Sequence, residues 1–421
     1  MATSQLRSYD DLDISSFEFW SQPARERDRA YEVLRRERPV SWHRPLRHAP
    51  GQAHGAAAGQ GGFWAVVRYQ DVRDIYRRHD EFCSGQGFML EDVPPVVSEH
   101  MSFIALDPPK HTKLRRLVNV AFTSRAIQRL EPWVHARAAA VVDDLLADGP
   151  GDFVEQVAKR LPLAAICEMV GVPEDERAEL AELMEDIIGR NDPAFAAKYP
   201  GTDPGVFVVQ GLHRLAEMGR VLAALRRRDP CDDLMTGLGQ AEVDGERLSG
   251  TEIGYFFNLL VSAGYDTTFN TIAIGLHALW EHPDQWELLR ANPDAHLDGA
   301  AEEVLRWATV GINFRRTATR PVRLGDAEIE PGEKVVMFLL SANRDEAVFR
   351  DPWRIDITRD PNPHIAFGGG IHFCLGSALA RMEIKAMYRE LFTRVPQMRI
   401  GAAEFACDNH LNAIKHLDIE F

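Results

Sequence analysis

Hydrophobic residues recur at helical spacing along most of the chain. In the clearest segment, residues 375–395, Arg, Glu and Lys separate apolar positions near a period of 3.6 residues: Leu375, Leu379, Met382, Ile384, Met387 and Leu391. Similar segments bounded by Pro or Gly predict further helices, over 25–38, 69–79, 111–122, 129–147, 152–169, 174–189, 206–228, 249–281 and 297–309.

Short β-branched or alternating runs predict strands at 39–43, 63–67, 314–319, 322–324 and 334–340, with a β-like tail at 412–421. The stretch 44–62 is rich in Gly, Ala, Pro and His, which predicts a surface loop. No repeat or change of composition marks a linker. We therefore predict one domain over 1–421, mainly α with a smaller β-rich part, with residues 1–20 as an N-terminal extension.

Composition narrows the class of protein. The formal net charge of −15 argues against a nucleic-acid binder. The five cysteines include no CxxC pair, which favours reduced thiols in a cytoplasmic protein. Asn258, Asp266, Asn270 and His277 would be costly in lipid. The apolar segment 255–280 is therefore interpreted as a buried helix, and we expect no membrane span.

A glycine-rich turn places one cysteine at the start of the 375–395 helix, in the sequence FGGGIHFCLG over 367–376. The helix dipole and free backbone N–H groups at such a position favour the thiolate of Cys374. This thiolate could be a nucleophile, a zinc ligand or an axial ligand of haem iron. A zinc site with His364, His372 and Cys407 lacks a compact ligand spacing. A dinucleotide site lacks the strand–helix unit that it needs.

The 249–281 helix carries an acid and a hydroxyl side by side, Asp266 and Thr267. A buried Asp is costly unless it is paired or solvated. The small residues Ala263 and Gly264 would let a flat cofactor approach the helix backbone. Asp266 and Thr267 could therefore relay protons. In the ordinary alternative, Asp266 is simply hydrogen-bonded and Thr267 bonds back to a helix carbonyl.

Two sets of charged residues depend on folding for their meaning. Glu303 and Arg306 share a helix face, where an exposed pair would contribute only about 0.2–0.5 kcal/mol, but Arg354 offers a second cation for a buried network. A second set is basic and scattered, and it would bind two carboxylates if its members converged: His111, Arg115, Arg316 and His372.

Together these motifs resemble those of the cytochrome P-450 monooxygenases, soluble bacterial type. The 367–376 loop matches that family's haem-binding loop at every defining position. The Ala-Gly-x-Asp-Thr-Thr helix, Glu303-x-x-Arg306 and His111-x-x-x-Arg115 match in order, and the similarity extends from about residue 17 to the C-terminus. The resemblance implies a P-450 fold, with haem between a long distal helix and a proximal cysteine loop and helix.

The resemblance also implies roles for single residues. Cys374 would ligate the iron of haem b, and Asp266 and Thr267 would deliver protons during oxygen activation. Glu303, Arg306 and Arg354 would form a structural charge triad behind the loop. The remaining residues expected to bind the cofactor, four of them through its propionates, are His111, Arg115, Arg316, His372, Ala263, Gly264, Phe367, Gly368 and Gly376.

By the same resemblance, four segments would face the substrate, and their members are Phe88, Met89, Leu90, Leu260, Val261, Ile312, Asn313, Phe314, Leu411 and Asn412. The set is mostly apolar, with Asn313 and Asn412 as polar handles. We therefore expect one atom of O2 to be inserted into a hydrophobic molecule such as a terpenoid, steroid, branched lipid or aromatic natural product.

The chain shows no flavin or iron–sulfur module, so electrons should come from a separate ferredoxin or flavodoxin with its NAD(P)H reductase. A basic cluster could dock this partner onto a monomer: Lys110, Lys113, Arg116, Arg125 and Arg129. Two alternatives keep the haem: a ligand-binding protein without oxidase activity, and a peroxide-driven peroxygenase. Neither would need the proton relay of Asp266 and Thr267.

Overall fold

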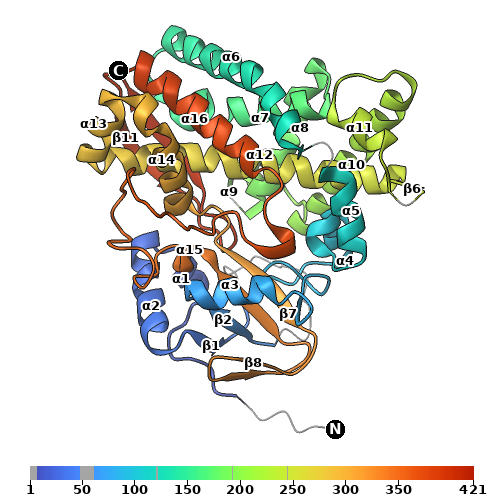
Figure 1. Cartoon of the computed structure of the whole chain (residues 1–421), viewed down its shortest axis with the longest axis vertical. Coiled ribbons are helices and arrows are strands. Elements are labelled where there is room, and N and C mark those ends of the chain that lie inside the picture. The colour runs from blue at the N-terminus through green and yellow to red at the C-terminus, as the bar shows by residue number, and fades with distance from the viewer. Residues whose placement is uncertain (1–6, 48–60, 120–121, 192, 244) are drawn as a thin grey trace.

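A computed structural model describes residues 7–47, 61–119, 122–191, 193–243 and 245–421. Helices form most of the molecule and the largest sheet lies at one end, which confirms the predicted fold class (Figure 1). The helices are α1 (Phe17–Trp20), α2 (Ala24–Glu37), α3 (Tyr69–Arg77), α4 (Pro95–His100), α5 (Lys110–Asn119), α6 (Ser124–Asp148), α7 (Arg160–Val170), α8 (Arg177–Ile188), α9 (Pro193–Lys198), α10 (Pro204–Arg228), α11 (Leu234–Gln240), α12 (Gly250–Trp280), α13 (Pro283–Ala291), α14 (Pro293–Ala308), α15 (Leu339–Ala342) and α16 (Ser377–Arg394).

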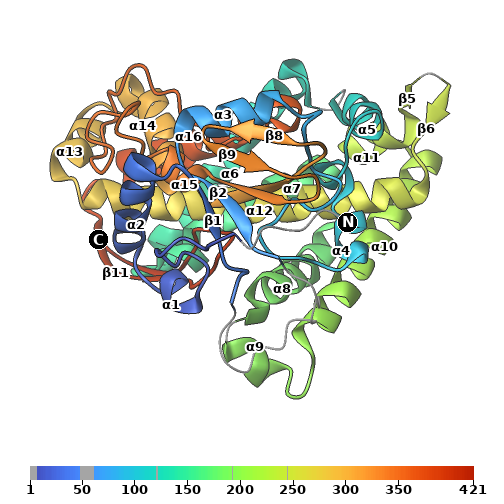
Figure 2. The same ribbon diagram turned by 90° about the horizontal axis from the view of Figure 1, so that it is seen from below.

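The long helix α12 crosses the molecule and is its central element (Figures 1 and 2). It begins at a capping box, in which the Ser249 side chain accepts from the backbone N–H of Glu252 and the Glu252 side chain accepts from that of Ser249. Most of its 31 residues are buried, and it packs against α7, α10, α14 and α16. In the described part of the chain, no helix is both long and apolar enough to cross a membrane.

The β-rich part contains a five-stranded sheet in the order β1-β2-β10-β7-β3. Strand β10 runs parallel to β2 and antiparallel to β7, with Arg316 of β7 opposite Val335. A separate sheet, β11-β12-β4, includes the C-terminal strand. The strands are β1 (Val40–His43), β2 (Phe63–Val66), β3 (Phe82–Cys83), β4 (Gly151–Asp152), β5 (Glu242–Val243), β6 (Glu246–Arg247), β7 (Asn313–Ala318), β8 (Val322–Leu324), β9 (Ala327–Ile329), β10 (Lys334–Phe338), β11 (Arg399–Phe405) and β12 (Ile414–Glu420).

Two predicted segments differ from the structure, and a third lies mostly outside the described residues. The expected N-terminal extension is packed into the molecule, because Phe19 and Trp20 of α1 are buried against Phe338 and its neighbours. The predicted 152–169 helix is a five-residue π-helical stretch (Val154–Ala158) followed by α7. Residues 48–60 of the predicted 44–62 loop lie outside the described residues.

Candidate active site

A cavity lies between α12 and the cysteine loop that precedes α16. Its walls come from distant parts of the chain, namely α3, α5, α7, α12, β7 and the 366–376 loop. Among the residues predicted from sequence, the lining includes Arg115, Leu260, Ala263, Gly264, Thr267, Phe314, Arg316, Phe367, Gly368, His372, Cys374 and Gly376. The fold therefore brings the cysteine, the small residues of α12 and three of the four predicted basic residues to one space.

The glycine-rich turn is required by its contact with α3. Gly368 and Gly370 have positive φ angles of 67° and 62°, which favour glycine. A Cβ on Gly370 would lie 2.1 Å from the Tyr76 carbonyl oxygen, so no side chain fits there. The turn brings Cys374 back to its first residue: the Cys374 backbone N–H donates to the Phe367 carbonyl at 3.0 Å.

The environment of Cys374 separates its possible roles. Burial raises the pKa of the Cys374 thiol, opposed by the Gly376 backbone N–H, Arg115 and Arg381. The sequence-based expectation of a favoured thiolate is therefore outweighed by desolvation, which argues against a free nucleophile. A bound metal ion deprotonates its thiol ligand outright. Among the described residues no three His, Cys, Asp or Glu side chains gather around a metal position, so the zinc alternative has no support.

In the described residues, the buried basic groups around the cavity form no ion pair with a carboxylate. Arg316 is 6% exposed and donates to the Arg315 carbonyl at 2.7 Å, but the described residues offer it no ion pair. His111, outside the lining itself, contacts the His372 ring at a tilt of 53°, with ring centroids 4.3 Å apart. Both ring nitrogens of His111 and Nδ1 of His372 lack hydrogen-bond partners. Burial, together with the nearby positive charges of Arg115 and Arg316, lowers the pKa of His111 to about 4 and that of His372 to about 2.

Arg115 is held in place from two sides. Its Nη2 donates to the Phe373 carbonyl at 2.7 Å and its Nε donates to Asn119 Oδ1 at 3.1 Å. Helix α5 is therefore attached directly to the cysteine loop. The remaining guanidinium edge borders the cavity.

Among the cavity residues that were not identified from the sequence, two have ionisable side chains, Tyr76 and Glu383. Tyr76 on α3 lies below the Arg316 guanidinium, whose Cζ is 5.7 Å from the ring centroid. Glu383 on α16 is 2% exposed, and its Oε2 has no hydrogen-bond partner. Burial raises the pKa of Glu383 well above 4.5, so the side chain is held neutral. In the sequence, Glu383 stands where a polar residue of an amphipathic helix normally faces solvent, so the pattern does not mark it as buried.

Asp266 and Thr267, adjacent on α12, face different spaces. Thr267 lines the cysteine cavity, and its hydroxyl donates to the Ala263 carbonyl at 2.7 Å. Asp266 lines a second cavity of about 840 Å³ together with Lys159 and Glu185. Burial raises the pKa of Asp266 to about 7, with Asp408 adding to the shift and Lys159 and the Asn270 amide opposing it. Gly264 lines the first cavity, and a Cβ there would lie 2.9 Å from Ile166.

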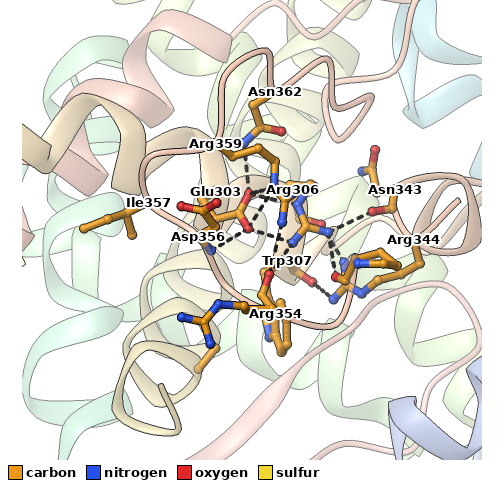
Figure 3. Close-up of polar contacts among 12 residues, drawn as sticks. Glu303, Arg306, Trp307, Asn343, Arg344, Arg354, Asp356, Ile357, Arg359 and Asn362 are labelled. Carbon is orange, nitrogen blue, oxygen red and sulfur yellow. Dashed lines mark hydrogen bonds and ion pairs between the residues drawn. The ribbon is translucent and has the colours of Figure 1, made fainter. Parts of the chain in front are cut away.

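Glu303 and Arg306 form the centre of a buried network (Figure 3). Both side chains are fully buried and joined by two hydrogen bonds of 2.7 and 2.8 Å. The prediction of Arg354 as the third member of the triad was wrong. Arg354 is 52% exposed and pairs with Asp284, and it contributes only its carbonyl oxygen, whereas Arg359 Nε lies 3.2 Å from Glu303 Oε2.

Most of the predicted substrate-facing residues do not line the cysteine cavity. Leu260 and Phe314 do, and Leu411 lines the second cavity. Four others, Phe88, Leu90, Val261 and Ile312, are buried in the protein core, and Met89 is half-buried outside the lining. The 86–92 loop is held away because Arg315 pairs with Asp92 and donates to the Gln86 carbonyl at 2.9 Å.

The two predicted polar handles have a structural role instead. Asn313 Nδ2 donates to the Asn409 carbonyl at 2.6 Å, and Asn412 Nδ2 donates to the Ala308 carbonyl at 2.7 Å. The Asn412 backbone N–H also donates to the Val310 carbonyl. These bonds attach the C-terminal loop to the segment that follows α14. Val310 and Phe314 of that segment line the cavity.

The unpaired groups around the cavity fit haem. Haem carries two carboxylates, which would satisfy the buried Arg316 and the free nitrogens of His111 and His372. Cys374 would supply the thiolate for the iron. Ala263 and Gly264 leave room on the face of α12 that borders the cavity.

Comparisons with known proteins agree with this geometry. The family model for Cytochrome P450 matches residues 212–394. The chain is 38% identical over 402 residues to a steroid C26-monooxygenase of Mycobacterium tuberculosis, covering 93% of this chain and 88% of that protein. It is 38% identical over 396 residues to a methyl-branched lipid omega-hydroxylase of the same species, covering 92% and 89%. The structure of Mycobacterium marinum cytochrome P450 CYP268A2 in complex with pseudoionone matches with a TM-score of 0.93 and 42% identity, covering 99% of this chain and 100% of that one.

Proposed function

The chain belongs to the cytochrome P450 family of haem-dependent monooxygenases, and we propose that it hydroxylates an uncharged, largely hydrocarbon molecule of the steroid, terpenoid or methyl-branched lipid class. Haem ligated by Cys374 supplies the oxygen-activating chemistry. The chain's own residues bind the substrate, exclude water and move protons.

The composition of the cavity wall carries the proposal for the substrate. The wall opposite the cysteine loop consists of apolar side chains, among them Phe256, Leu259, Leu260 and Phe314. The Lys, Arg, Asp and Glu residues in the described lining are Arg115, Arg316 and Glu383. The two arginines are assigned to the haem carboxylates and Glu383 is held neutral, so no charge remains to compensate an ionised substrate. The steroid, branched lipid and pseudoionone named for the similar proteins are all largely hydrocarbon.

Asp266 and Thr267 are proposed to carry protons between the two cavities. Asp266 borders the second cavity, while Thr267 borders the cysteine cavity one residue further along α12. A carboxyl group with a pKa of about 7 can take up and release a proton near neutral pH. The hydroxyl of Thr267 donates to the Ala263 carbonyl, which leaves its oxygen lone pairs free to accept a hydrogen bond.

Electrons are proposed to enter at the face formed by α5 and the cysteine loop. Arg115 connects this helix to Phe373, which is 43% exposed beside Cys374. Lys110 and Arg125 of the predicted basic cluster are exposed, whereas Lys113 pairs with Glu246 and Arg129 with Asp232. An acidic ferredoxin or flavodoxin, supplied by its NAD(P)H reductase, would dock here and compete with Glu246 and Asp232. We propose that the protein works as a cytoplasmic monomer, consistent with five free cysteines.

The substrate class can be tested by titration of the haem-loaded protein, following the Soret band for displacement of water from the iron. Pseudoionone, a steroid ketone and a methyl-branched alcohol are the probes, and a methyl-branched carboxylate of equal length is the matched control. We expect the uncharged compounds to shift the spectrum and the carboxylate to bind at least about tenfold more weakly, since one buried charge costs more than 1.4 kcal/mol. Preferential binding of the carboxylate would overturn the proposal. Oxygenated product formed with ferredoxin, reductase and NAD(P)H then establishes turnover.

A further inference from the structure

Arg27 on α2 is buried without a counter-ion. The residue is 6% exposed, and its Nε and Nη1 atoms have no hydrogen-bond partner. Arginine keeps its proton in proteins, so the positive charge remains in the interior. A buried charge is normally paired or bound to a ligand because desolvation is costly. In the described residues no carboxylate lies within ion-pair distance of this guanidinium.

A second arginine of the same helix shows what pairing looks like. Arg35 is 3% exposed, and its guanidinium lies 2.9 Å from Asp28 and 2.7 Å from Glu346. Asp28 adjoins Arg27 in sequence, but its carboxylate is taken by Arg35 and by the indole N–H of Trp353. The fold therefore pairs the charge of Arg35 with carboxylates, whereas the charge of Arg27 has no carboxylate partner among the described residues.

Asp408 offers no alternative partner. Asp408 raises the pKa of Arg27 against the lowering by burial, so its charge is felt at the guanidinium. Its carboxylate Oδ1 instead accepts from the backbone N–H groups of His410 and Leu411, at 2.6 and 2.7 Å. The Asp408 carboxylate therefore stabilises the C-terminal loop.

Two further donors near Arg27 are also unused. The indole N–H of Trp20 and the hydroxyl of Tyr31 are buried and have no partners. The Arg27 Cζ lies 5.5 Å from the Trp20 ring centroid, and Tyr31 follows four residues later on the same face of α2. The rings of Trp20 and Tyr31 both pack against Phe338. Helices α1 and α2 thus carry three buried donors of different chemistry that have no partner among the described residues, and the lining of the cysteine cavity includes none of them.

We propose that Arg27, Trp20 and Tyr31 form a binding site for a small monovalent anion, either a halide or a short carboxylate. Water could satisfy the indole and the hydroxyl, but only an anion also neutralises the guanidinium. The site is close to solvent, because Trp20, Cys407 and Asp408 line the open cavity of about 840 Å³. A bound anion would join α1 to α2 beside the loop that carries Asp408.

The test uses the haem-loaded full chain in two experiments. Crystals soaked in bromide should show an anomalous peak within hydrogen-bond distance of the Arg27 guanidinium. In solution, the midpoint of thermal unfolding should rise with bromide at constant ionic strength, because a ligand that binds only the folded state stabilises it. Acetate and formate, tested in the same way, distinguish a carboxylate site from a halide site.

Arg27→Met is the informative variant, and Arg29→Met is its control because Arg29 lies exposed on the same helix, where Glu26 is its ion-pair partner among the described residues. We expect the bromide-dependent rise to persist in Arg29→Met and to vanish in Arg27→Met. An equal rise in Arg27→Met would overturn the proposal. If Arg27→Met does not fold, the soak decides: water alone beside Arg27, with no bromide or carboxylate density, would overturn it as well.

Discussion

Two regions of this protein bury charge, and they treat it in opposite ways. Around Glu303 and Arg306, each charged group meets partners of the opposite charge or backbone groups of matching polarity (Figure 3). Around the cysteine cavity, Arg316 has no carboxylate and His111 has two free nitrogens. Both regions are buried and adjoin the cysteine loop. The difference in how their charges are paired therefore reflects their roles and not how deeply they are buried.

The difference separates structure from ligand binding. The Glu303–Arg306 pair, whose charges compensate each other, can hold a loop rigidly without an added group, whereas Arg316 and the free nitrogens of His111 and His372 border a cavity that an anionic group could fill. The Glu303 network therefore fixes the chain around 352–362, and the cavity is set up for an anionic cofactor. The comparison predicts that substitutions in the two regions will differ in what they destabilise.

Arg306→Met should have the largest effect. The substitution leaves Glu303 buried with a single remaining cation, Arg359, and removes the donors to the Asn343 and Pro352 carbonyls. Breaking a buried pair costs about 3–5 kcal/mol. We expect a loss of this size in the free energy of unfolding, measured by chemical denaturation with and without haem. A loss seen only in the haem-loaded protein would assign Arg306 to the cofactor and break the comparison.

Asp266→Asn tests a buried charge that is neither ion-paired, like Glu303, nor without a partner, like His111. The Asp266 carboxylate has one amide partner, Asn270. We expect turnover to fall by about 100-fold, the lower range for loss of a general acid, with haem still bound. The wild-type rate should also fall above pH 7, because deprotonation through a pKa of about 7 removes the proton donor. The Asn variant should lack that limb of the pH profile, and Thr267→Ala should release more hydrogen peroxide per electron pair. A wild-type profile retained in Asp266→Asn would exclude the relay.

Arg316→Met should weaken haem binding and spare the apoprotein. Loss of a hydrogen-bonded charge contributes about 1.5–3 kcal/mol, or roughly 10- to 150-fold in haem affinity. The apoprotein should unfold at the same denaturant concentration or higher, because an unpaired buried cation is removed. Haem transfer to apomyoglobin measures the first quantity and urea denaturation the second. Arg320→Met, an exposed neighbour paired with Asp80 and Glu81, is the control.

Glu383→Gln should be stabilising at neutral pH. The folded-state pKa of Glu383 lies well above 4.5, so unfolding releases a proton above that pH and the wild type loses up to about 1.4 kcal/mol per pH unit relative to the variant. Below pH 4.5 the two proteins should be equally stable. Parallel stability curves between pH 4 and 7 would show that Glu383 ionises in the folded protein and has a partner.

The features that could be predicted from the sequence lie within one continuous segment of the chain. The features that were missed depend on contacts between segments that are distant in the sequence. The cysteine loop could be identified because its glycines, its cysteine and the following helix are adjacent along the chain. The orientation of the 86–92 loop could not, since it depends on Arg315 and Lys334, both of which pair with Asp92. Tyr76 was missed because its role depends on Arg316, on another element.

The exchange of Arg354 for Arg359 has the same origin. The two arginines lie five residues apart in irregular chain, where spacing does not determine which side chain points inward. The outward direction of Arg354 is set by Asp284, on a helix, α13, that the hydrophobic pattern did not predict. Identification of residue types was therefore more reliable than assignment of partners.

Arg354→Met should have the smallest effect. Its pair with Asp284 is half exposed, and such pairs contribute about 0.2–1 kcal/mol. Its carbonyl, which accepts from Arg306 and Arg359, is kept in the variant. Arg359→Met, in contrast, removes a buried cation from Glu303 and a donor to the Arg350 carbonyl, so its cost should be several times larger. Chemical denaturation of the two variants side by side measures the ratio. A larger loss of unfolding free energy in Arg354→Met than in Arg359→Met would show that the exposed Arg354 side chain contributes to the buried network, and Arg354 would then belong with Glu303 and Arg306 rather than with the solvated surface.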